Sequence, residues 1–149
     1  MRIYHGTSER HVADILQNGI KPRTLTNHSN WEHSCESNPD LVYLTDIYPG
    51  YFAACATELP DRWAIVEVDL DSLDEDNLYP DEDFVAQCMR HFNPELDGMT
   101  LADVTDHVRD NIDQYKGYWL SSLRGLGNVA HMGTVPLYAI TRIALFDPS

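Results

Sequence analysis

Three segments of the chain carry residues whose types and spacing could do chemistry, and the first is His5-Gly6-Thr7. It stands at the end of a predicted strand and leads into a predicted helix. An imidazole can exchange a hydrogen bond with a sugar hydroxyl. A glycine lets a ligand approach the backbone closely, and a helix N-terminus attracts phosphate. The segment therefore indicates a ligand that carries a sugar and a phosphate.

The second segment is a strand-like run that contains Tyr43 and Thr45. A helix is predicted to follow it from Pro49, and that helix carries Tyr51 and Phe52. The third segment, 128–136, offers Asn128 and His131 as hydrogen-bonding groups, and no glutamate follows Glu95.

Taken together, these segments resemble the ADP-ribosyltransferase superfamily, which includes the poly(ADP-ribose) polymerases and, in related form, the RNA 2′-phosphotransferases. The resemblance rests on the His-Gly-Thr at 5–7, a Gly-Ile exit from the next helix at 19–20, and the Tyr-Leu-Thr at 43–45. The segment 135–140 also resembles the end of the late strand region of that family. These motifs are short, although the order of the elements agrees over most of the chain.

The resemblance implies a split β-sheet with flanking helices and NAD as the substrate. His5 would bind the ribose next to nicotinamide, Gly6 would contact the nicotinamide amide through its backbone, and Tyr43 would stack on the ring. An aromatic face attracts a cation by roughly 0.5–2 kcal/mol, which suits the cationic nicotinamide of NAD. The further residues expected to contact NAD are Thr7, Trp31, Thr45 and Tyr51.

The resemblance also implies a glutamate on a late strand, where it would stabilise the positive charge that develops as the ribosyl bond breaks. This chain offers Asn128 and His131 there instead. We therefore expect His131 or Asn128 to complete the catalytic set with His5 and Tyr43.

Strands and helices in an α+β order must position these residues. We predict strands over 2–5, 41–45 and 63–70, and a broken strand over 129–146. We predict helices that begin after a cap at Thr7 or Ser8, at Pro49, after Pro80 and at Thr100, and a short helix that ends near Gly125. A long loop is expected over 21–40 and an acidic turn over 71–83. All of this fits one domain over residues 1–149.

The first of these helices should bury Val12, Ile15 and Leu16 on one side and stop at Gly19. The helix that begins at Thr100 should bury Val104, Val108 and Ile112 in the same way.

The composition narrows the class of partner. The chain has 24 acidic and 10 basic residues and a formal net charge of -14. Because such a field repels phosphate backbones, nucleic-acid binding is disfavoured, and we expect a protein acceptor, particularly a basic one. A nucleobase stays open as an acceptor.

Cysteine usage and hydropathy favour the cytoplasm. Cys35, Cys55 and Cys88 form no CxxC pair, and the chain shows neither a signal peptide nor a run long enough to span a membrane. His28, His33 and Cys35 have the types of zinc ligands but lack a fourth partner, so no metal is predicted.

Two alternative functions remain open. One is a catalytically degenerate ADP-ribosyltransferase-like module, such as an inhibitor or immunity factor, that acts through its acidic surface. The missing late glutamate favours it. The other is NAD-dependent RNA 2′-phosphotransfer, which needs arginines to grip phosphates and is disfavoured by the net charge.

Overall fold

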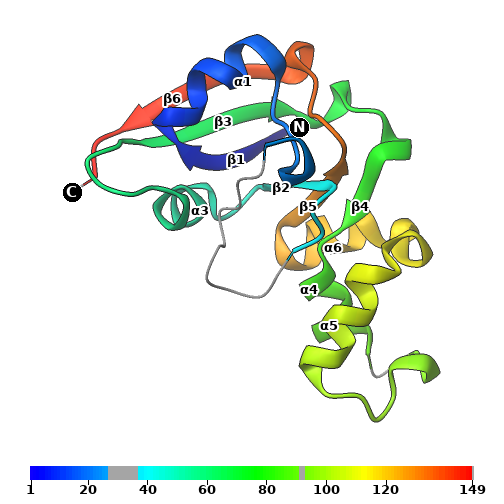
Figure 1. Ribbon diagram of the computed structural model, residues 1–149. Coiled ribbons are helices and arrows are strands. Elements are labelled where there is room, and N and C mark those ends of the chain that lie inside the picture. Colours follow the sequence, from blue (N-terminus) through cyan, green and yellow to red (C-terminus); the bar gives the residue numbers. More distant parts are fainter. Residues whose placement is uncertain (27–36, 91–92, 149) are drawn as a thin grey trace.

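The computed structural model describes residues 1–26, 37–90 and 93–148. Its centre is a six-stranded sheet in the order β4-β5-β2-β1-β3-β6 (Figure 1). In chain order the strands are β1 (Arg2–Ser8), β2 (Leu41–Thr45), β3 (Trp63–Asp69), β4 (Leu78–Pro80), β5 (Asn128–Met132) and β6 (Ile140–Phe146). Each neighbouring pair is antiparallel. The α+β class predicted from the sequence is confirmed at this level.

The sheet consists of two well-paired halves with a narrow junction. Strand β1 pairs with β3 along its whole length, from Arg2↔Asp69 to Ser8↔Trp63. Strand β2 pairs with β5 in the same continuous way. Between β1 and β2, in contrast, the described strands share one register pair, Tyr4↔Thr45. The two half-sheets, β6-β3-β1 and β2-β5-β4, therefore diverge beyond that pair.

Helices cover the two halves differently (Figure 1). They are α1 (Val12–Asn18), α2 (Arg23–Thr26), α3 (Pro49–Ala56), α4 (Glu82–Phe84), α5 (Leu101–Asp110) and α6 (Trp119–Leu126). Helices α1 and α3 flank the half that contains β1, and α4, α5 and α6 gather beside β4 and β5. A π-helical turn, Val85–Met89, follows α4. Short 3₁₀ turns lie at Glu9–His11, Leu70–Ser72, Glu75–Asn77, Pro94–Leu96, Ile112–Tyr118 and Leu137–Ala139.

Two apolar clusters hold this arrangement together. In the first, Ile15 of α1 packs with Ile3 and with Val66 and Val68 of β3. In the second, the helices α4 and α5 pack on the other half through Phe84, Val104 and Val108, together with Ala130 of β5. The strand predicted over 63–70 is confirmed as β3, in which Ala64, Val66 and Val68 share one face and are all fully buried.

Several predicted signals occur as expected. Pro49 begins α3, and the Thr100 side chain caps α5 by accepting a hydrogen bond from the Asp103 N–H. Gly19 ends α1 with a φ of 79°, a left-handed value that suits glycine. The predicted broken strand over 129–146 is confirmed: it is interrupted between Met132 and Ile140, in the segment that contains Gly133 and Pro136.

The predicted start of the first helix is wrong. Strand β1 continues to Ser8 because it pairs with β3, and a 3₁₀ turn precedes α1. Neither Thr7 nor Ser8 caps this helix: the Ser8 hydroxyl donates to Asp61 at 2.7 Å instead. Leu16 is also not a core residue, since 57% of it is exposed.

Two elements lie where turns or loops were expected. Strand β4 lies within the predicted acidic turn 71–83, and α2 lies within the predicted loop 21–40. Within the described residues, no helix has both the length and the apolar character needed to cross a membrane.

Gly6 fixes how closely α3 approaches the sheet. A Cβ built on Gly6 would lie 2.6 Å from the Pro49 carbonyl oxygen and closer still to the Ala53 nitrogen. Because both are backbone atoms, no rotamer change could make room. The glycine thus lets the backbone of α3 pack directly against β1.

Replacing Gly6 by alanine should therefore destabilise the fold by roughly 1–3 kcal/mol, the usual range for overpacking. The free energy of unfolding from urea titration measures this. Gly50→Ala in the same helix is the matched control, because nothing lies within 4 Å of its added Cβ. Equal stability of the two variants would contradict the close packing of α3 on Gly6.

Candidate functional site

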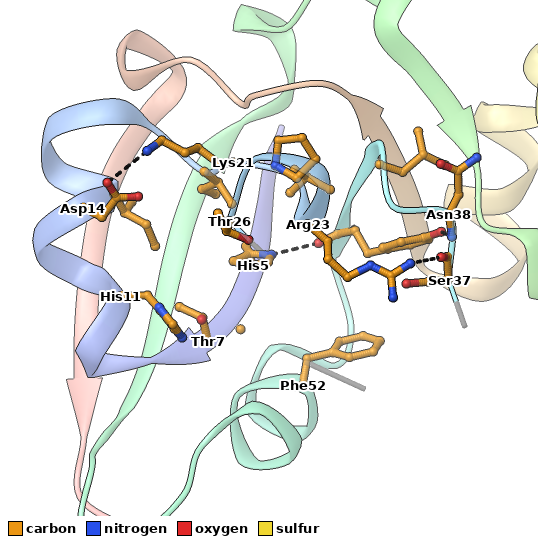
Figure 2. A pocket seen from close by; sticks show the side chains of 17 residues that line it. His5, Thr7, His11, Asp14, Lys21, Arg23, Thr26, Ser37, Asn38 and Phe52 are labelled. Atoms are coloured by element: carbon orange, nitrogen blue, oxygen red, sulfur yellow. Dashed lines mark hydrogen bonds and ion pairs between the residues drawn. The ribbon is translucent and has the colours of Figure 1, made fainter. Parts of the chain in front are cut away.

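A pocket opens where the two half-sheets diverge (Figure 2). We call it the junction pocket. Its walls come from β1, α1, the segment that follows α1, β2 and α3. Among its lining residues are His5, Thr7, Lys21, Arg23, Tyr43 and Phe52. Segments far apart in the sequence thus contribute to one cavity, and four predicted NAD contacts, His5, Gly6, Thr7 and Tyr43, line it together.

The His5 imidazole is held in one tautomer. Its Nδ1 lies 3.0 Å from the carbonyl oxygen of Tyr43. A carbonyl oxygen can only accept, so Nδ1 carries the proton and donates. Burial lowers the pKa of His5 below its ordinary value, against an opposing effect of the bond to Tyr43. The neutral ring then keeps a lone pair on Nε2, which can accept a hydrogen bond from a hydroxyl group.

Phe52, rather than Tyr51, is the aromatic residue that α3 contributes to the pocket. Figure 2 shows Phe52 on the α3 side of the cavity, across from β1. Tyr51 was predicted to contact NAD, but it is 61% exposed and does not line the pocket. Successive residues of a helix point about 100° apart, so the face that packs on Gly6 cannot present both rings.

The Tyr43 hydroxyl is part of a partly buried hydrogen-bond chain. The Asn38 N–H donates to this hydroxyl at 3.2 Å, and the hydroxyl lies 2.9 and 2.7 Å from the two carboxylate oxygens of Glu82. Burial, followed by the nearby Glu82 charge, raises the pKa of Tyr43 well above its ordinary value. Tyr43 therefore remains protonated at neutral pH and donates to Glu82.

The pocket gathers cationic side chains in a strongly acidic protein. Lys21 and Arg23 both line it, and Asp14 is the carboxylate beside them. Lys21 lies 3.1 Å from Asp14, and Arg23 donates to the Ser37 carbonyl at 2.7 Å (Figure 2). Because an exposed ion pair such as Lys21–Asp14 contributes only about 0–1 kcal/mol, an anionic ligand can compete for Lys21.

Thr45 has a structural position outside the pocket lining. It is buried at the junction pair with Tyr4. Its hydroxyl donates to the Gly127 carbonyl and accepts from the backbone N–H groups of Ile47 and Tyr48. These bonds fix the turn between β2 and α3, so Thr45 positions Tyr43 and Phe52 rather than a ligand.

His131 and Asn128, which were predicted to complete the catalytic set, are not among the residues that line the junction pocket, although His131 pairs across the strands with Val42, which does line it. His131 is buried on β5, and its Nδ1 donates to the Gly133 carbonyl at 3.0 Å. Burial lowers the pKa of His131. Asn128 pairs with Thr45 across the strands, and its side chain donates to Asp81 at 3.2 Å. Neither residue lines the pocket.

One predicted NAD contact, Trp31, lies outside the described residues, as do His28, His33 and Cys35. The described segments on either side contribute Thr26 and Ser37 to the pocket.

The sequence interpretation missed Lys21, Arg23, Phe52 and Glu82. Lys21 and Arg23 lie in the segment that was predicted to be a loop. Because basic residues are few in this acidic chain, two of them close together in sequence could have indicated an anion-binding site. Glu82 falls within the acidic turn that was predicted over 71–83. Only the tertiary fold brings it to Tyr43.

Comparison with known proteins gives no further guide: the chain matches no family model and no curated protein.

Asp81, the neighbour of Glu82, makes the stability of the fold depend on pH. The Asp81 carboxylate accepts from the Asp83 N–H and from Asn128, but burial raises its pKa from 3.8 to about 7. Between these two values the folded protein holds a proton that the unfolded chain has released. A rise in pH over this range therefore lowers the free energy of unfolding.

The free energy of unfolding attributable to Asp81 should fall as the pH rises from about 4 to about 7, and level off above it. Urea titrations at several pH values, compared between the wild type and Asp81→Asn, isolate this contribution from the other carboxyl groups. The exposed Asp103→Asn is the control and should follow the wild type. A constant stability difference between wild type and Asp81→Asn across this range would refute the assignment.

Proposed function

We propose that the junction pocket binds NAD and that the protein is an ADP-ribosyltransferase. One observation carries the proposal: the His-Gly-Thr motif at 5–7 and Tyr43 of the Tyr-Leu-Thr motif, which resemble motifs of that superfamily, line one pocket although they are far apart in the chain. The divergence of the half-sheets at Tyr4↔Thr45 supports the finer proposal of a split-sheet fold of the same type.

The aromatic and histidine side chains suit the nicotinamide riboside end of NAD. Tyr43 and Phe52 line the pocket from β2 and α3, and an aromatic face attracts a cationic ring. The Nε2 of neutral His5 is an acceptor for a ribose hydroxyl. The backbone of α3 fills the space where a side chain at position 6 would lie, so a ligand in the pocket would contact Gly6 through its backbone atoms.

Lys21 and Arg23 suit the diphosphate. A guanidinium donates paired N–H groups to phosphate oxygens, and an ammonium adds a point charge. In a chain with a net charge of -14, two cations that line one pocket are a local exception. The exception favours an anionic ligand there.

ADP-ribosyl transfer breaks the bond between the nicotinamide nitrogen and the ribose, and nicotinamide leaves with the electron pair. A nucleophile of the acceptor then bonds to the ribose carbon and loses its proton. Aromatic stacking and the His5 contact would hold the reacting groups in place. Because the protein is strongly acidic, a basic protein is the acceptor that its surface attracts best.

A second candidate function is NAD binding without transfer, by a module that acts on a partner through its acidic surface. Two observations favour it: Asn128 and His131 do not line the pocket, and the described lining offers few acidic groups. Among the described residues that line the pocket, the carboxylate is Asp14, and Lys21 already pairs with it.

Phe52→Ala should weaken NAD binding about tenfold, because it removes one aromatic face from the pocket. Tyr51→Ala is the matched control from the same helix and should bind NAD as the wild type does. Calorimetry with NAD measures both. Absence of NAD binding by the folded wild type would overturn the proposal, and nicotinamide release after incubation separates the two candidate functions: release supports transfer, and binding without release supports the module.

Arg23→Gln should weaken the binding of NAD and of ADP-ribose by about tenfold and leave the affinity for free nicotinamide unchanged, since a charge-assisted phosphate contact contributes about 1.5–3 kcal/mol. The control is Arg124→Gln, which removes the same charge from an exposed position on α6. Calorimetric titration with the three ligands gives the affinities. A uniform loss for all three ligands would show that Arg23 supports the pocket instead of holding the diphosphate.

A further inference from the structure

Glu82 is a buried carboxylate that the proposed chemistry leaves without a role. It follows the Asp81 cap at the start of α4 and is 5% exposed. Both of its carboxylate oxygens lie within hydrogen-bond distance of the Tyr43 hydroxyl, at 2.9 and 2.7 Å. It does not line the junction pocket, so it acts on a ligand only through Tyr43.

The direction of the hydrogen bonds is fixed by their donors. The Asn38 N–H donates to the Tyr43 oxygen, so the single hydroxyl proton of Tyr43 is left to donate to Glu82. A bond from a neutral hydroxyl to a carboxylate is charge-assisted and stronger than one between neutral groups. It draws electron density from the O–H bond into the phenol ring. The ring then presents a more negative face.

The neighbouring acids do not share this geometry. The Asp81 carboxylate is occupied by the Asp83 N–H and by Asn128, on the side of β5. Asp83 is exposed. Of the three consecutive acids at 81–83, Glu82 is the one whose carboxylate bonds to Tyr43.

We infer that Glu82 is a positioning residue that makes Tyr43 selective for a cationic ring, an inference that rests on the proposed NAD site. The carboxylate fixes the orientation of the Tyr43 ring and adds a negative charge at its hydroxyl end. A cationic ring in the pocket gains from both effects, whereas a neutral ring of the same shape gains only from the orientation. Glu82 thereby favours oxidised NAD over NADH, whose dihydronicotinamide ring is uncharged.

The test compares the affinities for NAD and NADH in the wild type and in Glu82→Gln, which keeps the shape of the side chain and removes its charge. Asp83→Asn is the matched control, because it removes the same charge from the adjacent position. Calorimetry gives the ratio of the NADH to the NAD dissociation constant. We expect this ratio to fall about tenfold in Glu82→Gln and to stay unchanged in Asp83→Asn.

A second readout needs no ligand. The carbon-13 chemical shift of the Tyr43 carbon that bears the hydroxyl reports the charge-assisted hydrogen bond. It should move in Glu82→Gln and remain in place in Asp83→Asn. If Glu82→Gln does not fold, Tyr43→Phe removes the same link from the other side, and its NADH to NAD ratio should fall likewise.

The outcomes separate the two proposals. If the wild type binds NAD and the variant lowers the affinities for NAD and NADH equally, Glu82 only supports the structure, and the inference is overturned while the NAD site stands. If the folded wild type does not bind NAD, the proposed function itself fails.

Discussion

The pocket depends on how β1 and β2 meet. Beyond one register pair, a side chain and no longer the main chain of β1 makes the hydrogen bond to β2. An antiparallel ladder that begins at Tyr4↔Thr45 would continue toward Gly6 and Tyr43, but the described strands share no register pair beyond the first. Instead the His5 imidazole donates to the Tyr43 carbonyl. A buried carbonyl needs a partner, and here a side chain supplies it. The half-sheets can therefore separate, and a cavity opens without leaving this backbone group unsatisfied.

Much of the fold was predictable because local signals and tertiary packing agree. Strand β3 alternates buried and partly exposed residues, and α5 has both a cap at Thr100 and a buried stripe. The failures occur where packing overrides local preference. The Gly-Thr-Ser that ends β1 has the composition of a turn, yet β3 extends the ladder through it. Strand β4 is too short, and too close to acidic residues, to have a pattern of its own.

The site was predictable to the extent that it rests on short motifs, and no further. His5 and Tyr43 were identified from their neighbours in sequence, and both line the pocket. Phe52 rather than Tyr51 lines the pocket, and the sequence could not show this because the inner face of a helix is known only once its rotation about its axis is known. The close approach of α3 at Gly6 determines that rotation. Lys21, Arg23 and Glu82 reach the site through tertiary contacts, which no local pattern encodes.

The burial of adjacent carboxylates beside the pocket is hard to explain by stability alone. Burial raises the pKa values of Asp81 and Glu82, so each carboxylate carries a desolvation cost, and at Glu82 the hydrogen bond from Tyr43 opposes this shift by favouring the charged form. A pair of apolar residues of similar size would avoid this desolvation cost. Asp81 has a structural use, since it caps α4 and is bonded to Asn128. Glu82 caps no helix, and its carboxylate accepts a hydrogen bond from the hydroxyl of Tyr43, a residue that lines the pocket. Violations of local physical rules concentrate at functional sites, and this one points to the same pocket as the motifs do.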